Sequence, residues 1–276
     1  MPRDISPPRG GAGRARLRPV TDQRRFASLR AIGALILREV STSYGRSGGY
    51  IWAIAEPVGG IVLLTLIFSA GFRTPPLGTN FAIFYATGIV PFFIYMDISG
   101  KVAGAIDYSK SLLAYPAVTF MDALVARVLV NMLTQALVAY LIFTVIYFTQ
   151  ETRTAPEIEG IMTSLAMLLV VAIGVGAVNC FLFSAFPWWR HVWAIVTRPM
   201  FLLSGIFFIY DDIPQPYQDW LWFNPLIHVV GQMRRSFYPS YDGDYVSPIY
   251  VFALGLGLIL VGLVLLLRFH RDLQNS

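Results

Sequence analysis

Long runs without a charged residue constrain the fold of this chain more than any other feature of its sequence. A bilayer core requires about 20 mainly apolar residues per helix, because backbone N–H and C=O groups cannot be left unpaired in lipid. Of the six runs given below, the third, fourth and sixth reach that length by themselves. The first two runs reach it if each extends over one acidic residue, and the fifth reaches it if it extends back over Arg198 to Val192. We therefore predict an all-α integral membrane protein with six transmembrane helices. The six runs are Pro57–Phe72, Phe81–Met96, Val128–Gln150, Ile161–Trp189, Pro199–Tyr210 and Tyr245–Leu267.

The composition agrees with burial in a bilayer. Of 276 residues, 56% are hydrophobic and only 13% are charged, against about 25% charged residues in ordinary soluble domains. The formal net charge of +5 could suggest a nucleic-acid partner. The positions of the basic residues along the chain indicate instead a membrane topology.

The distribution of Lys and Arg predicts the orientation. Loops on the cytoplasmic side carry an excess of these residues. If both termini are cytoplasmic, that side holds fifteen Lys and Arg residues and the opposite side holds four, Arg73, Arg153, Arg234 and Arg235. Arg127 and Arg198 complete the 21 and lie near cytoplasmic span ends. We expect N and C termini in the cytoplasm and no nucleic acid among the partners.

The chain before the first span divides into two parts. Residues 1–25 are rich in Arg, Pro and Gly and predict a disordered cytoplasmic tail. Residues 26–45 predict an amphipathic helix in the membrane interface, because apolar side chains from Phe26 to Tyr44 share one side of a helical wheel. A soluble helix packed on a partner is the alternative. The six-span domain follows over residues 46–276, after the glycines of "YGRSGGY".

Two connections are long enough to hold structure of their own. On the cytoplasmic side, the segment Lys101–Arg127 is too polar to cross the membrane. Its first part, residues 101–117, predicts a short helix ending near Pro116 and placed to contact a cytoplasmic partner. On the outer side, residues 211–244 predict two short amphipathic helices that are broken at Asn224-Pro225 and re-enter the outer membrane face before the last span.

Motifs of the common catalytic and metal sites are missing from the sequence. There is no GxxxxGK[ST] phosphate loop, no GxSxG, no HExxH and no CxxC, and His191, His228 and His270 lie in separate segments. We therefore expect a permease rather than an enzyme, without a metal or cofactor in this chain. An ATP-independent channel or a membrane-embedded enzyme is the alternative from another functional class.

Four charged residues lie within or beside the predicted spans, all in the cytoplasmic half: Glu56, Asp97, Arg127 and Arg198. A charge at such depth costs roughly 2.5–3.5 kcal/mol on insertion scales, so these side chains should face protein or water. They either line a polar vestibule or pair structurally, for example Asp97 with Arg127. Aromatic residues such as Trp52 and Tyr95 could likewise guide a sugar or only form packing and interfacial belts.

Five motifs, in order along the chain, resemble one transporter family. They are "LREVSTSYGRSGGYIWAIAEP" at the first span, "TGIVPFF" in the second, "SLLAYPAVTFMDALVAR" before the third, "LLSGIFF" in the fifth and "NPLIHVVGQMR" in the outer region. Together they resemble the permeases of type-2 ABC exporters, specifically the capsular-polysaccharide branch, from about Ala31 to the end. Residues 1–25 have no counterpart in that pattern.

The resemblance implies a homodimer of permeases with two copies of a separate ATPase, which carries the ATP and Mg²⁺. The machine would move a lipid-linked polysaccharide across a bacterial inner membrane towards periplasmic and outer-membrane export proteins. Export of O-antigen, teichoic acid or a small lipid or drug by the same fold is the alternative. Substrate-channel candidates are Trp52, Glu56, Tyr95, Asp97, Arg127 and Arg198. ATPase-coupling candidates are Arg38, Glu39, Lys101, Asp107, Lys110 and Tyr115.

Overall fold

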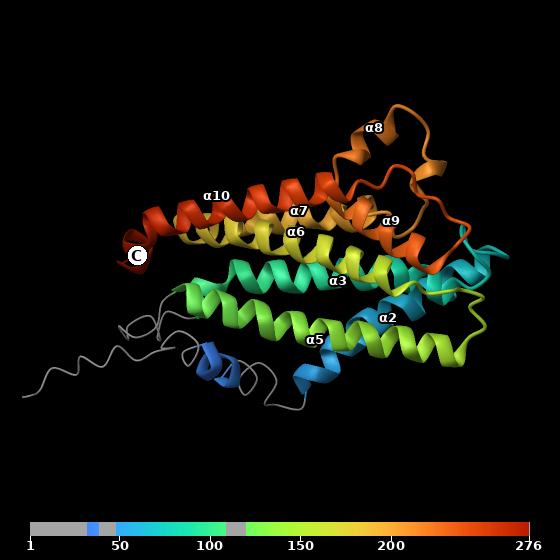
Figure 1. The fold of residues 1–276 in the computed structure, drawn as a ribbon, viewed down its shortest axis with the longest axis horizontal. Helices are drawn as coiled ribbons and strands as arrows, with labels where there is room; N and C mark the ends of the chain where they lie inside the picture. The colour runs from blue at the N-terminus through green and yellow to red at the C-terminus, as the bar shows by residue number, and fades with distance from the viewer. Residues whose placement is uncertain (1–31, 39–47, 109–119, 276) are drawn as a thin grey trace, which may run out of the picture.

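The computed structural model describes residues 32–38, 48–108 and 120–275, and all its long elements are helices (Figure 1). The predicted tail 1–25 and the helix end near Pro116 lie outside these residues. Of the glycine turn predicted over residues 44–50, residues 48–50 are described, and they form the start of a helix rather than a turn. Of the predicted interface helix 26–45, the described part is residues 32–38, which are helical. The main helices are α2 (Gly48–Gly71), α3 (Phe81–Ala103), α5 (Phe120–Thr149), α6 (Ile158–Ala185), α7 (Trp189–Leu203), α8 (Tyr217–Trp222), α9 (Pro225–Phe237) and α10 (Pro248–Asn275).

Five of the described helices are long and apolar enough to cross a membrane: α2, α3, α5, α6 and α10. They correspond to five of the six predicted spans. The fifth predicted span differs, because α7 has only 15 residues and is about 22 Å long at 1.5 Å per residue. The chain leaves the helix at Ser204-Gly205, where Gly205 has a φ of +81° that other residues rarely adopt.

Side-chain caps fix where two helices begin. Asn80 ends the short α2–α3 loop, and its side chain accepts hydrogen bonds from the backbone N–H groups of Ala82 and Ile83 at the start of α3. Asn224 does the same for α9 by accepting from Leu226 N, with Pro225 at the first helical position. These contacts satisfy N–H groups that have no partner within the helix. The helix break predicted at Asn224-Pro225 is therefore confirmed.

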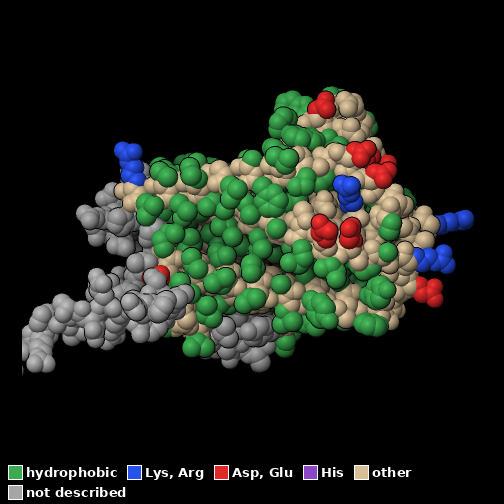
Figure 2. Space-filling view, in the orientation of Figure 1, with side chains coloured by type: hydrophobic (Ala, Val, Ile, Leu, Met, Phe, Trp, Pro, Cys, Tyr) green, Lys and Arg blue, Asp and Glu red, His purple; other side chains and the backbone are tan. Residues whose placement is uncertain are grey.

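The core lies around α3 and α6. In α3, 72% of the membrane-length window is buried inside the protein, against 11% in α2. Phe84, Ile89 and Ile98 of α3 and Met167 and Val171 of α6 are almost fully buried. Helices α2, α5 and α10 surround this pair and leave apolar side chains on the outside, where a soluble protein would carry polar ones. Figure 2 shows hydrophobic side chains over the length of the bundle.

The bundle has two different ends (Figure 1). Residues 32–38, the end of α3 and the C-terminal end of α10 lie toward one end, which we call the proximal end, and α2 begins between this end and the middle of the bundle. The α2–α3 and α5–α6 loops and helix α9 lie toward the other, the distal end, and α8 projects sideways from that half. Most charged side chains visible in Figure 2 lie in the distal half.

A buried arginine holds the broken end of α7. Arg234 of α9 is 2% exposed and donates hydrogen bonds to the carbonyl oxygens of Phe208 at 2.6 Å and Ile206 at 3.0 Å. Its guanidinium also lies over the Phe84 ring, 4.3 Å from the centroid. Burial lowers the pKa of this guanidinium, but an arginine remains charged at neutral pH. The non-helical backbone after α7 is thus satisfied by a side chain rather than by a helix.

Candidate functional site

Two of the predicted charged residues line one cavity. Glu56 of α2 and Asp97 of α3 both face a cavity of about 310 Å³ between α2, α3 and α5. Its other walls are Ala53, Pro57, Phe92, Phe93, Met96 and Gln135. Helix α2 continues through Pro57 without ending, which places Glu56 about 12 Å from its first residue at 1.5 Å of rise per residue. The cavity therefore combines two carboxylates and an amide with an apolar wall in the proximal half of the bundle.

Asp97 pairs with Lys101, one turn further along α3, and not with Arg127 as the sequence suggested. The Asp97 Oδ2 to Lys101 Nζ distance is 3.0 Å, and both side chains are partly exposed, at 30% and 25%. Lys101 Nζ also donates to Asn131 Oδ1 of α5 at 2.5 Å. The spacing of four residues on one helix makes the Asp97–Lys101 pair the closer choice. The pair leaves Asp97 facing the cavity and Lys101 facing the proximal end.

Arg127 continues the same network towards the proximal end. Asn131 Nδ2 donates to the Arg127 carbonyl oxygen at 2.6 Å, and Arg127 Nη1 donates to the Gly104 carbonyl oxygen at 3.2 Å. The Arg127 guanidinium lies 4.1 Å from the centroid of the Tyr108 ring, which the Arg38 guanidinium also approaches, at 5.2 Å. Cations over an aromatic face are attracted by about 0.5–2 kcal/mol. Polar contacts therefore run from Asp97 to Arg38 through α3 and α5.

A second contact at the proximal end joins α3 to α7. The Asp107 carboxylate, just after α3, forms a salt bridge with Arg190 in the first turn of α7, and both side chains are partly exposed, at 43% and 49%. Trp189, next to Arg190, donates its indole N–H to Asn179 Oδ1 of α6 at 2.9 Å. The start of α7 is thus tied to two neighbouring helices. The predicted coupling residues Glu39, Lys110 and Tyr115 lie outside the described residues.

Three predicted channel residues lie away from the cavity. Trp52 is 71% exposed on α2, and Arg198 is exposed on α7. Tyr95 is 1% exposed and belongs to the hydrophobic core. A role for these three in contacting a substrate stays a prediction, and for Tyr95 it would require a change of packing.

Several polar residues of this region were not among the sequence candidates: Asn131, Gln135, Tyr108 and Arg190. Asn131 and Gln135 interrupt the apolar run of α5 at a spacing of four residues, which places both on the face towards α3. That spacing is a signal that the sequence carried. Tyr108 and Arg190 have no such signal, because their partners come from other segments.

The chemistry of the site is that of charge and hydrogen bonding. Within the described ranges, no group of three or more His, Cys, Asp or Glu side chains could hold a metal ion. Glu56 and Asp97 place two carboxylates in a half-apolar cavity that could hold a polar molecule, and Lys101 pairs with Asp97 outside the cavity wall.

Comparison with known proteins agrees with a bundle of membrane helices. Residues 30–238 match the model of the family described as ABC-2 type transporter. This match covers more than half of the chain, so the protein belongs to the ABC-2 type transporter family. The resemblance carried by the five sequence motifs is thereby confirmed.

Individual relatives that align over nearly their whole length are polysaccharide transport or export proteins. The chain is 32% identical over 236 residues, 85% of its length and 91% of the relative's, to the polysialic acid transport protein KpsM of Escherichia coli. It is 26% identical over 246 residues (89% and 93%) to the capsule polysaccharide export inner-membrane protein CtrC of Neisseria meningitidis, and 26% identical over 249 residues (89% and 93%) to BexB of Haemophilus influenzae, which has the same description.

Proposed function

We propose that the protein is the membrane-spanning subunit of an ATP-driven exporter that moves lipid-linked capsular polysaccharide across a bacterial inner membrane. The names of the three relatives, matched over nearly their whole length, support this cargo. The observation that carries the proposal is the line of contacts from Asp97 through Lys101, Asn131 and Arg127 to Tyr108 and Arg38. It connects a charged cavity with the end where an ATPase would bind.

The proposed topology has six crossings with both termini in the cytoplasm. In this arrangement the proximal end faces the cytoplasm, and α7 together with residues 204–209 makes the fifth crossing. Non-helical backbone is tolerated at membrane depth only where protein or a wet cavity surrounds it. Arg234 supplies such surroundings for residues 206 and 208. Helices α8 and α9 would then re-enter the outer face of the membrane, and residues 32–38 would lie in the interface.

The proposed assembly is a homodimer with two copies of an ATPase that binds ATP and Mg²⁺. Apolar side chains stay exposed on α2 and α7, among them Val62, Leu66, Ile195 and Leu202, and a second copy or lipid would cover them. Periplasmic and outer-membrane export proteins would receive the polymer. The alternative is an exporter of O-antigen, teichoic acid or a small lipid or drug. Cells that lack this chain would accumulate a different material for each cargo, and chemical analysis of that material identifies it.

The Asp107–Arg190 salt bridge provides a test of coupling. Reversing one charge, in Asp107→Arg or Arg190→Asp, should lower polysaccharide export two- to fivefold, because an exposed pair contributes about 1 kcal/mol or less. The double variant restores opposite charges and should recover most of the loss. Export is measured as surface polysaccharide at equal membrane-protein level, together with the hydrolysis rate of the co-purified ATPase. Unchanged export in both single variants would remove this contact from the coupling path.

The cavity is tested by neutral variants of the same shape. Asp97→Asn and Glu56→Gln should each reduce export by about tenfold, equivalent to about 1.4 kcal/mol, while leaving membrane insertion and ATPase association unchanged. The control is Glu159→Gln, which neutralises an exposed carboxylate at the distal end. If Glu56→Gln disrupts assembly instead of transport, Glu56 is a structural anchor. If both variants export like the control, the cavity is not on the path of the polymer.

A further inference from the structure

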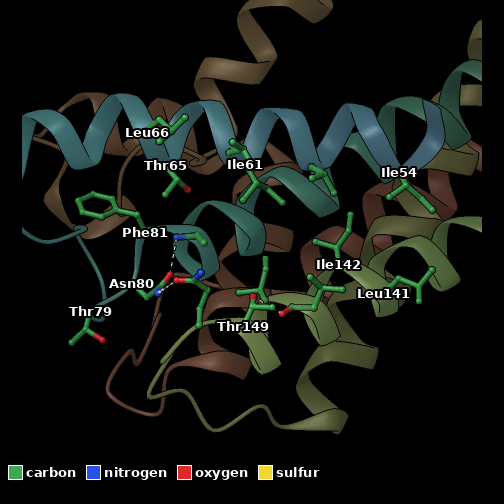
Figure 3. A pocket seen from close by; sticks show the side chains of 16 residues that line it. Ile54, Ile61, Thr65, Leu66, Thr79, Asn80, Phe81, Leu141, Ile142 and Thr149 are labelled. Carbon is green, nitrogen blue, oxygen red and sulfur yellow. Dashed lines mark hydrogen bonds between the residues drawn. The ribbon is translucent and has the colours of Figure 1, made fainter. Parts of the chain in front are cut away.

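A second and larger cavity opens between α2 and α5 and extends from the α2–α3 loop to the level of Ile54 on α2 (Figure 3). Its volume is about 710 Å³. Both helices pack on α3, but they touch each other little, so a groove remains between them over α3. The wall is apolar along most of its length, with Ile54, Val58 and Ile61 from α2 and Leu141, Ile142 and Val145 from α5. None of these features belongs to the Glu56–Asp97 cavity or its network.

The groove has one polar end. Thr79, Asn80, Thr149 and Gln150 line it near the α2–α3 loop, where Asn80 Nδ2 donates to Gln150 Oε1 at 3.3 Å. Thr65 lies close to this end, and Ile54 and Leu141 lie at the other (Figure 3). The Thr65 hydroxyl is buried and has no hydrogen-bond partner among the described residues, whereas Thr149 bonds its own helix at Val145 O, 2.7 Å away. A buried donor without an acceptor is costly, which points to a ligand oxygen beside Thr65.

The dimensions of the groove match one lipid. From Ile54 to Leu66 it follows α2 for about 18 Å at 1.5 Å per residue, close to the thickness of one leaflet, which is about half of a 30 Å hydrocarbon core. Hydrocarbon chains in van der Waals contact at about 4–4.5 Å fill roughly 300–360 Å³ each over that length, so two chains fit. A helix about 10 Å across would fill roughly 1,400 Å³ over the same length, about twice the space. Two acyl chains therefore match the enclosed volume, whereas a helix of a second copy could lie only partly within it.

We infer that this groove binds one bilayer phospholipid of the leaflet at the distal end. Its acyl chains lie between α2 and α5, an ester oxygen accepts the hydrogen bond of the Thr65 hydroxyl, and the headgroup contacts the amides of Asn80 and Gln150. We assign a phospholipid because two acyl chains fill the apolar groove and the uncharged amides and hydroxyls at its polar end suit ester oxygens; retention of the lipid anchor of the cargo is an outcome that the test separates. The bound lipid fills the space between two helices that line the Glu56–Asp97 cavity, α2 and α5. The inference requires only membrane insertion and does not depend on the polysaccharide cargo.

The test uses the full chain, purified from cells without glycan synthesis and placed in nanodiscs of phosphatidylethanolamine and phosphatidylglycerol. A phosphatidylethanolamine with a photoreactive acyl end should label the peptides around Leu141 and Ile142. Val62→Trp narrows the groove and should reduce this label at least threefold. Leu63→Trp is the matched control, because Leu63 is similarly exposed on α2, at 58% against 50% for Val62, but does not line the groove. This variant should leave the label unchanged.

A second variant removes only the hydroxyl. Thr65→Val should lower the number of phospholipids that stay bound in native mass spectrometry at least threefold, without change in the folded fraction. Equal label in the two tryptophan variants, or equal retention in Thr65→Val and the parent chain, would overturn the inference. So would a Val62→Cys variant that forms a disulfide with a second copy, or preparations from glycan-producing cells that retain a glycolipid in place of the phospholipid.

Discussion

Replacing Arg234 by Met should destabilise the protein by about 2–5 kcal/mol. The variant leaves the carbonyl oxygens of Ile206 and Phe208 without their donors, and each buried acceptor without a partner costs about 1–3 kcal/mol. Because the site is buried, with Arg234 only 2% exposed, little water can reach these acceptors to replace the guanidinium. For a chain of this size the loss should lower Tm by about 5 °C or more, measured as the folded fraction by size-exclusion chromatography in detergent after heating.

Arg235 provides the control for this variant. It is the next residue of α9 and is exposed, so Arg235→Met should leave Tm within about 1 °C of the parent chain, as is usual for surface substitutions. Arg234→Lys keeps the charge but cannot reproduce the planar fork that reaches two carbonyl groups, and we expect an intermediate Tm. If Arg234→Met and Arg235→Met have the same Tm, Arg234 does not hold the end of α7.

Arg234 also shows where the sequence could not predict the fold. As one of four basic residues on the predicted outer side, it supported the orientation, and nothing nearby in the sequence indicated that it is buried. Its partners are backbone carbonyl groups that come into reach only because the chain leaves the helix at Gly205. An apolar run such as Pro199–Tyr210 predicts burial but carries no information on whether its backbone is helical. The fifth predicted span could therefore be placed from sequence as an apolar run, and its break at Gly205 could not be predicted.

The candidate site was predicted in part. Glu56 and Asp97 were chosen as embedded charges, and the structure brings them to one cavity because α2 and α3 are joined by a short loop and pack as antiparallel neighbours. The predicted partner of Asp97 was wrong, although Lys101 lies only four residues further along the same helix. Charge depth alone suggested Arg127, which instead contacts Gly104 and Tyr108. Tyr95 was chosen as an aromatic residue within a span, but its face of α3 is turned to the core, which hydropathy does not reveal.

Two glycine-to-alanine substitutions in α10 should change stability in different ways, and this difference tests how the bundle is held together. A methyl group on Gly255 would lie 2.6 Å from Val170 Cγ1 and 2.9 Å from the Val170 carbonyl carbon of α6, whereas a methyl group on Gly257 would meet nothing within 4 Å. Gly255→Ala should therefore push α6 and α10 apart and cost about 1–3 kcal/mol. Gly257→Ala should leave stability unchanged or raise it by roughly 0.5–1 kcal/mol, because alanine favours the helix.

The same argument extends along the helix. Gly262 is seven residues from Gly255 and lies on the same face, and a methyl group there would lie 2.7 Å from Ala177 Cβ. Small residues at such positions let membrane helices approach closely, and packing between them replaces the hydrophobic effect that lipid does not provide. The double variant Gly255→Ala, Gly262→Ala should not remain folded in detergent, and the folded fraction is measured by the same heating assay. A double variant as stable as Gly257→Ala would show that the two helices separate without cost and that the bundle is held elsewhere.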